Sequence, residues 1–349
     1  MSINLTVGTN FDIRQLEFFI ECNQKYDQVK ITNVYGSIRT NYLNLSSVRP
    51  NFRLGNADRK DFEKYVLLAR ENNIRVDYTV NSLLHMPIEE LYDKQEELIN
   101  NLKYLESVGV ERIISSNPLI MEIVSDNTSL KLKCSTILGI NRVNAIKHYS
   151  KYRVDSICPD IYINRNLPLL SEMQKECDKY GIKIELLANE VCMFGDVPCS
   201  NVMRSNCYIH SSLGGNSSQR FNGWPFARCQ EARKNNPSSI LKIPFILPIH
   251  LEKYYQNTGI SNFKISGRTN TFEYLTSTVE KYMSQTFSGN LENLFMLPQN
   301  VLESSKNGIT VEQLIKCGYF NKMLSTSKGC DYHCHECKYC DELYEKLNV

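Results

Sequence analysis

The sequence lacks the features that mark several large classes of protein. It has no apolar run long enough to span a membrane, and its first residues lack the basic and apolar regions of a signal peptide. It contains no HExxH, no GxSxG and no Walker loop, so the common signatures of zinc peptidases, serine hydrolases and P-loop NTPases are missing. These absences predict a cytoplasmic protein without a membrane span, whose chemistry rests on other residues.

An excess of charge of one sign is also absent. The 40 Lys and Arg residues nearly balance the 38 Asp and Glu residues, which leaves a net charge of +2. Whole-chain charge therefore gives no argument for a nucleic-acid partner. Hydrophobic residues make up 42% and charged residues 22% of the 349 positions, which is typical of a globular protein. This length allows one large barrel or two ordinary domains.

Short strand-like runs alternate with helical patterns along most of the chain. The strand-like runs are 3–7, 29–34, 75–80, 111–115, 131–137, 156–161, 183–187 and 263–266, and a further apolar run lies at 240–246. Asp58 is expected to cap a helix over 59–71, and Gly109 to end a helix over 88–107. Strands that alternate with helices predict a parallel sheet with crossover helices.

About eight such units fit the length of a (β/α)8 TIM-like barrel, which typically takes about 250 residues. The alternative, a doubly wound sheet, lacks its glycine-rich turn, because Val7-Gly8-Thr9-Asn10 does not match GxGxxG. We predict the α/β class, with a TIM-like barrel over 1–290 and a cysteine-bearing insertion at about 189–238. A small C-terminal cysteine-rich extension is predicted over 291–349.

Polar residues follow several of the predicted strands. In a barrel the carboxyl ends of the strands carry the active site, so amides and hydroxyls there suit a polar ligand and cations suit an anionic one. The alternative for each is an ordinary turn former, or an ion pair with a barrel carboxylate for the cations. The predicted substrate-binding residues are Asn10, Tyr35, Asn81, Lys264 and Arg268.

Thirteen cysteines in a reducing compartment do not form a disulfide scaffold. A central group follows the run 183–187 and lies in a polar loop; it consists of Cys192, Cys199, Cys207 and Cys229. Thiols gathered in this way indicate an iron–sulfur cluster, zinc or copper(I), and their spacing is too wide for a zinc ribbon. The alternative is a set of small buried apolar residues.

Asn189 and Glu190 end the strand that precedes these cysteines, and we predict both as catalytic residues. Burial at a strand end can raise the pKa of a carboxyl group into the range of an acid–base catalyst, whereas the alternative is a structural carboxylate. The loop 200–235 is basic, with Glu231 as its only acid. Its cations suit an anionic substrate, and its interleaved aromatic residues allow RNA binding by base stacking. A solvated loop, or arginines that offset a thiolate cluster, is the alternative.

A terminal group is formed by Cys330, Cys334, Cys337 and Cys340, with the spacing C-x3-C-x2-C-x2-C. Spacings of this kind recur in metal sites. The neighbouring His333 and His335 allow a structural zinc, whereas C-x2-C-x2-C resembles part of a ferredoxin run and favours a second [4Fe–4S] cluster. Both interpretations remain open from the residues alone.

The central cysteine spacing, together with the runs 242–246, 263–268 and 289–291, resembles peptidase family U32 over most of residues 1–295. The resemblance implies a barrel with a [4Fe–4S] cluster on Cys192, Cys199, Cys207 and Cys229. Better understood relatives act in oxygen-independent hydroxylation of a quinone precursor or of RNA bases. The family usually has His-Gly before the first cysteine, where this chain has Asn189-Glu190-Val191.

We therefore expect an iron–sulfur-dependent barrel enzyme that carries out redox or oxygen-independent hydroxylation chemistry. Its substrate would be a polar or anionic small molecule or RNA, and an electron donor or partner subunit would supply electrons. A U32-like peptidase or other hydrolase with structural zinc is one alternative. A non-catalytic metal-binding subunit of a complex is the other.

Overall fold

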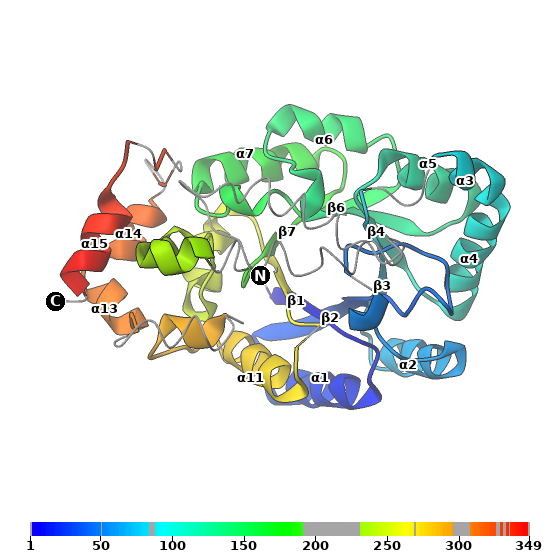
Figure 1. Cartoon of the computed structure of the whole chain (residues 1–349), viewed down its shortest axis with the longest axis horizontal. Coiled ribbons are helices and arrows are strands. Elements are labelled where there is room, and N and C mark those ends of the chain that lie inside the picture. The colour runs from blue at the N-terminus through cyan, green and yellow to red at the C-terminus, as the bar shows by residue number, and fades with distance from the viewer. Residues whose placement is uncertain are drawn as a thin grey trace.

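The computed structural model describes residues 2–49, 51–83, 88–190, 231–268, 270–295, 308–325, 329–330, 333–334 and 336–347. Eight parallel strands close into a barrel in chain order (Figure 1). The strands are β1 (Ile3–Gly8), β2 (Val29–Gly36), β3 (Arg75–Val80), β4 (Arg112–Ser115), β5 (Lys131–Cys134), β6 (Val154–Ile157), β7 (Lys183–Leu187) and β8 (Asn262–Ile265). This topology confirms the predicted (β/α)8 TIM-like barrel.

Helices connect the strands and lie around the outside of the barrel (Figure 1). They are α1 (Ile13–Lys25), α2 (Arg59–Glu71), α3 (Ile88–Asp93), α4 (Gln95–Val108), α5 (Pro118–Asn127), α6 (Val143–Tyr149), α7 (Leu167–Asp178) and α11 (Phe272–Met283). The side chain of Asp58 accepts a hydrogen bond from the Asp61 N–H, which confirms the predicted cap of α2. Gly109 ends α4 with a φ of 98°, which confirms the predicted stop.

Four local predictions differ from the structure. The strand predicted over 156–161 is β6, which ends at Ile157, since Asp160 caps a 3₁₀ turn shortly after it. The pattern over 88–107 forms two helices, because Lys94 leaves the helical conformation between α3 and α4. The strand predicted over 131–137 ends at Cys134, since Ser135 caps a 3₁₀ turn directly after it. The apolar run at 240–246 begins inside the 3₁₀ helix η4 (Pro237–Lys242) and adds no strand to the barrel.

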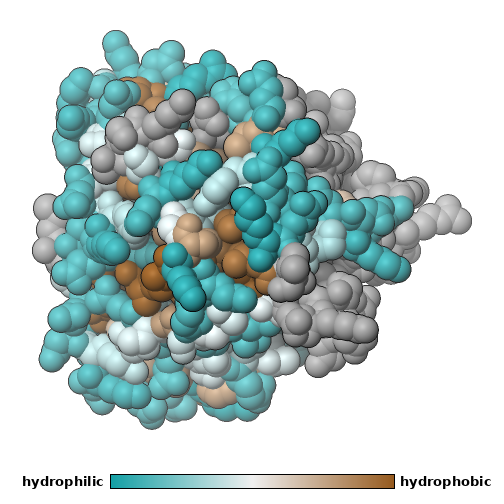
Figure 2. Space-filling view, turned by 90° about the vertical axis from the view of Figure 1, so that its left-hand side faces the viewer, coloured by the Kyte–Doolittle hydropathy of each residue, from teal (hydrophilic) through white to brown (hydrophobic). Residues whose placement is uncertain are grey.

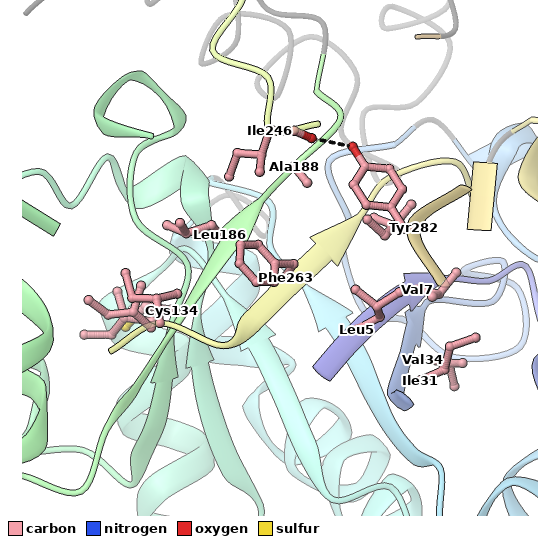
Figure 3. Packing of buried hydrophobic residues seen from close by; sticks show 14 of the residues in the cluster. Leu5, Val7, Ile31, Val34, Cys134, Leu186, Ala188, Ile246, Phe263 and Tyr282 are labelled. Carbon is pink, nitrogen blue, oxygen red and sulfur yellow. Dashed lines mark hydrogen bonds between the residues drawn. The ribbon is translucent and has the colours of Figure 1, made fainter. Parts of the chain in front are cut away.

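The apolar core lies between the strands and the surrounding helices. Leu5 and Val7 of β1 are fully buried in one cluster with Leu16 and Phe19 of α1. Figure 3 shows some members of this cluster, among them Leu5 and Val7, and the hydrogen bond, 2.7 Å long, from the Tyr282 hydroxyl to the Ile246 carbonyl. Burial of aliphatic and aromatic side chains on this scale is the main source of the barrel's stability.

The segment that follows the barrel packs against the return of the chain at 231–242. It contains α13 (Val311–Lys316), α14 (Tyr319–Met323) and α15 (Tyr339–Leu347). Lys242 of η4 forms an ion pair with Asp341 of α15, with 2.9 Å between Nζ and Oδ1. Most of the described surface on this side is hydrophilic, with small hydrophobic groups near its centre (Figure 2). None of the helices in the described part of the chain is long and apolar enough to cross a membrane.

Candidate active site at the carboxyl end of the barrel

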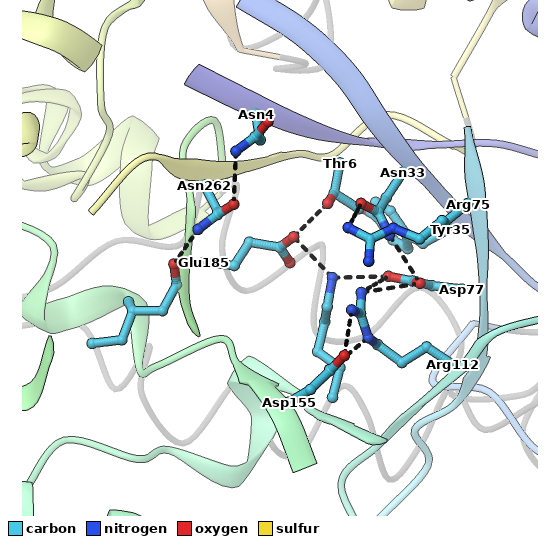
Figure 4. Close-up of polar contacts among 12 residues, drawn as sticks. Asn4, Thr6, Asn33, Tyr35, Arg75, Asp77, Arg112, Asp155, Glu185 and Asn262 are labelled. Atoms are coloured by element: carbon cyan, nitrogen blue, oxygen red, sulfur yellow. Dashed lines mark hydrogen bonds and ion pairs between the residues drawn. The ribbon is translucent and has the colours of Figure 1, made fainter. Parts of the chain in front are cut away.

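Charged side chains occupy the middle of the barrel, where branched apolar residues are common in this fold. The Lys133 Nζ donates to Asp77 Oδ2 and to Glu185 Oε1, both at 2.8 Å. Arg112 contacts Asp77 on its other side, with 3.2 Å between Nη1 and Oδ2. Thr6 donates to the same Glu185 oxygen that Lys133 contacts. Figure 4 shows Asp77, Arg112 and Glu185 pointing toward one another inside the barrel.

These interior charges balance one another. Burial alone would raise the pKa of Asp77, but the charges of Arg112 and Lys133 outweigh it and lower the pKa to about 2. Burial opposes the charge of Lys133 in the same way, and its two carboxylate partners raise its pKa. The group is therefore fully ionised near neutral pH, and removing one member would leave an uncompensated buried charge.

Lys264, which lies on β8 nearer to the mouth of the barrel, has a different environment. Its side chain is buried with the residue 7% exposed, and its Nζ lies 3.8 Å from the centroid of the Tyr35 ring. Among the described residues, no carboxylate and no hydrogen-bond acceptor lies within bonding distance of this nitrogen. Burial therefore dominates and lowers the pKa of Lys264 to about 8.

Arg268 follows β8 and is a second buried cation at the mouth. Its Nη1 donates to Thr79 Oγ1 at 2.8 Å and its Nη2 donates to Ser47 Oγ at 3.0 Å. Its Cζ lies 5.7 Å from the centroid of the Tyr35 ring. Burial lowers the pKa of Arg268 to about 10, and the charge of Arg49 adds to this shift. Within the described ranges its partners are hydroxyls and no carboxylate offsets its charge.

Two of the predicted binding residues, Asn81 and Asn10, organise the loops of this mouth. Asn81 Oδ1 accepts from Ser47 Oγ and from the Val48 N–H, both at 3.4 Å. It thereby holds the loop that brings Ser47 to Arg268. Asn10 Oδ1 accepts from the Asp12 N–H at 3.1 Å, a local turn that leads into α1.

Asn189 and Glu190 lie at the same end of the barrel, after β7. The Asn189 side chain accepts from the Ser266 N–H at 2.7 Å and donates to the Ser266 carbonyl at 3.0 Å. This pair of bonds joins the chain after β7 to the chain after β8, beside Lys264 and Arg268. Burial raises the pKa of Tyr35, and the charge of Glu190 contributes to the same direction of shift. Their catalytic roles stay predictions.

The predicted central ligands Cys192, Cys199, Cys207 and Cys229 lie outside the described residues. Of the terminal group, Cys340 is buried in α15, Cys330 and Cys334 are half-buried, and Cys337 is exposed. Burial raises the pKa of Cys340 to about 12, and the nearby Cys330 and Cys334 contribute to the shift. Within the described part of the chain, no three thiol, imidazole or carboxylate side chains converge on one metal position. Both metal sites stay predictions.

Several residues of the site escaped sequence reasoning. Asp77, Lys133 and Glu185 lie inside short strands whose other charged residue is the first one, and their inward direction follows from the alternation of side chains along a strand. This alternation was the signal that could have found them. Ser47 and Arg49 lie in a long loop between β2 and α2, where no periodic pattern predicts which residue reaches the mouth.

Comparisons with known proteins agree with the barrel fold and also identify the family of this chain. The family model described as peptidase family U32 matches residues 31–293. An uncharacterized protease of Methanocaldococcus jannaschii is 24% identical over 306 residues, which cover 85% of this chain and 82% of the relative. The solved structure of a U32 peptidase superposes with a TM-score of 0.50 at 12% identity, covering 76% of this chain and 94% of that one. The chain belongs to peptidase family U32.

Proposed function

We propose that this protein is a barrel enzyme that binds an anionic substrate over Lys264, Arg268 and Tyr35 and modifies it with an iron–sulfur cluster. The reaction class that we propose is redox or oxygen-independent hydroxylation-type chemistry. One observation carries the binding part of the proposal. Two cations, Lys264 and Arg268, are buried near the same Tyr35 ring at the carboxyl end of the barrel, and no described carboxylate forms an ion pair with either of them.

A buried charge without a counter-charge is costly, because the protein interior solvates it poorly. The interior of the same barrel shows how this chain avoids that cost, since Asp77 and Glu185 each contact Lys133 at 2.8 Å. The mouth lacks such an arrangement in the described residues, so a bound anion would supply the missing charge. Arg268 is already oriented by two hydroxyls, which suits it to hold a carboxylate or phosphate group.

The same charges suit a cluster held by thiolates, which carries net negative charge. Cys192, Cys199, Cys207 and Cys229 would hold it, in the segment that begins after Glu190 at the mouth of the barrel. The cluster would supply single-electron transfer or a site of substrate activation. Cys330, Cys334, Cys337 and Cys340 would hold a second [4Fe–4S] cluster or a structural zinc, next to η4. Glu190 would exchange protons with the bound substrate.

Oxalate, a small dianion, is expected to bind at the mouth, and Arg268→Met is expected to weaken its binding by about tenfold or more, since a charge-assisted hydrogen bond contributes about 1.5–3 kcal/mol. Isothermal titration calorimetry on the anaerobically purified full chain measures the dissociation constant. Arg70→Met is the matched control, because Arg70 is an exposed arginine in the last turn of α2. Oxamide, which is uncharged, should not bind. Equal affinities of wild type and Arg268→Met for oxalate would refute the site.

The affinity for oxalate is also expected to fall as the pH rises through about 8, because Lys264 then loses its proton. The titratable and charged groups around it are Cys158, Glu185, Asp77, Lys133, Arg268 and Tyr35. Burial raises the pKa of Cys158 to about 11, so this thiol does not titrate in the same range. Lys264→Met should bind oxalate more weakly and without the step near this pH.

Gly8→Ala is expected to disturb the mouth through sterics alone. A Cβ at Gly8 would lie 3.0 Å from the backbone nitrogen of Arg268 and 3.3 Å from the Tyr35 hydroxyl. Overpacking of this kind costs about 1–3 kcal/mol, and we expect weaker oxalate binding together with a lower urea midpoint. Gly181→Ala is the control, since its φ of 67° strains any side chain while nothing lies within 4 Å. It should lower stability and leave oxalate affinity unchanged.

A peptidase is the second candidate, and the names of the relatives favour it. The archaeal relative is described as an uncharacterized protease, and the solved neighbour as a U32 peptidase. Gelatin hydrolysis by the anaerobic preparation, with and without a zinc chelator, separates the two candidates. Cleavage that persists in Arg268→Met and disappears with the chelator would favour the hydrolase.

A further inference from the structure

Lys264 is placed where a substrate atom could reach it. It lies on β8, paired in register with Thr6 of β1 and Leu187 of β7, close to the carboxyl ends of those strands. Active-site residues of this fold come from these strand ends. The side chain of Lys264 lies against the face of Tyr35, the ring that Arg268 also approaches. An amine and an anion-binding guanidinium therefore share one wall of the mouth.

Lys133 provides an internal comparison. Both lysines are buried, on strands of the same barrel, with their side chains directed inward. Lys133 Nζ contacts two carboxylates at 2.8 Å, and these hold it as an ammonium ion with a raised pKa. Lys264 Nζ lies against the Tyr35 ring and forms no ion pair among the described residues. Burial disfavours its charge, Cys158 and Glu185 favour it, and two further cations, Lys133 and Arg268, disfavour it. A lysine desolvated next to cationic groups is the arrangement that makes an amine nucleophilic.

A carboxylate oxygen that could exchange protons lies in the layer below. Glu185 is buried, and its Oε1 accepts from Lys133 and from Thr6. Its Oε2 has no hydrogen-bond partner in the described part of the protein. Glu185 and Lys264 lie on the neighbouring strands β7 and β8, and the charge of Glu185 favours the charged form of Lys264. A buried acceptor without a donor calls for a bound group or water that fills the place.

We propose that Lys264 is a catalytic amine that forms an imine with an oxo acid, whose carboxylate Arg268 binds. This inference rests on the proposed function, because it uses the same anion site and names the class of substrate. The uncharged amine adds to the carbonyl carbon, a C–N bond forms, and the carbonyl oxygen takes up a proton. The carbinolamine then loses water to give the imine, and the nitrogen releases a proton to water or to Glu185. No oxidant or reductant is consumed.

Glyoxylate and cyanoborohydride test the proposal on the full chain, purified anaerobically. At about pH 8, roughly half of the Lys264 amines are uncharged, against under 1% of exposed lysines, so we expect Lys264 to be reductively alkylated about tenfold faster than the surface lysines. Peptide mapping by mass spectrometry reports the added carboxymethyl group at each lysine. The peptide that contains Lys133 is the matched internal control and should stay unmodified. Lys264→Met should abolish the fast modification, and in the wild type excess oxalate should slow the modification of Lys264.

The outcomes separate this inference from the proposed function. Oxalate binding by calorimetry together with no preferential modification of Lys264 would overturn the imine and leave the anion site in place. Absence of both would overturn the two proposals together. Fast modification that Arg268→Met slows, while modification of the surface lysines is unchanged, would support the role of Arg268 as the carboxylate anchor.

Discussion

Replacing Lys133 by methionine is expected to destabilise the protein by about 3–5 kcal/mol, because it leaves two buried carboxylates without their shared cation. Asp77 and Glu185 each lie 2.8 Å from the Lys133 nitrogen, and both are buried. Lys264→Met is expected instead to raise the free energy of unfolding. Lys264 forms no ion pair among the described residues, and burial outweighs the attraction of Glu185 for its charge, so methionine removes a desolvated cation without breaking an ion pair. The pair of variants compares two buried lysines of one barrel.

The expected gain in stability on Lys264→Met follows from the linkage between proton binding and folding. The pKa of Lys264 is about 8 in the folded protein, below the value of about 10.4 for an exposed lysine, because burial disfavours the charged amine. Between these two pH values the unfolded chain binds more protons than the folded one, so the free energy of unfolding rises as the pH increases. The shift corresponds to a cost on the order of 3 kcal/mol near neutral pH, which Lys264→Met would relieve.

Urea unfolding followed by circular dichroism measures both variants, from about pH 7 to about pH 10. The wild type should gain stability over this range relative to Lys264→Met, and the two curves should converge at the high end. Lys133→Met should be the less stable protein throughout. Equal destabilisation by both substitutions would show that Lys264 is also paired in the folded protein, and would remove the basis for the anion site.

The barrel fold was predictable from the sequence, because each strand–helix unit is specified by residues within that unit and the units repeat along the chain. Apolar strand-like runs, helix caps such as Asp58 and stops such as Gly109 each specify one unit, and right-handed crossovers leave few ways to assemble eight such units. The errors fell where one residue ends an element early. The break at Lys94 and the cap at Ser135 interrupt patterns whose hydrophobic period continues.

The location of the candidate site at the strand ends was predictable from the sequence, whereas the full set of residues that form it was not. Lys264 and Arg268 were identified as anion-binding candidates from their position at the end of a strand, and the structure places both at the mouth, beside Tyr35. Among the described residues no carboxylate forms an ion pair with either cation; this depends on which side chains meet across the barrel, and a sequence pattern does not carry that information. The loop residue Ser47 reaches Arg268 only because Asn81, far away in the sequence, holds its loop.

Cys199→Ser is expected to remove about four iron atoms per chain, because a [4Fe–4S] cluster needs its thiolate ligands. The matched variant Cys337→Ser should change only the metal of the terminal group. Iron, acid-labile sulfide and zinc are measured on anaerobic preparations of the wild type and both variants. Wild type with about eight irons would carry two clusters, and one with four irons and a zinc would carry a structural terminal site. Unchanged iron in Cys199→Ser would refute the assignment of the central ligands.

The two variants also separate the roles of the groups. The terminal group lies beside η4, where Lys242 and Asp341 form an ion pair, so loss of its metal should loosen the return of the chain at 231–242. We therefore expect Cys337→Ser to lower stability and to affect oxalate binding only indirectly. Under the proposed function, Cys199→Ser should instead remove the negative charge of the central cluster. Oxalate should then bind the mouth at least as tightly as in the wild type, because the two cations have lost a competing negative charge. Weaker binding in Cys199→Ser would mean that the cluster, and not the cations alone, holds the anion.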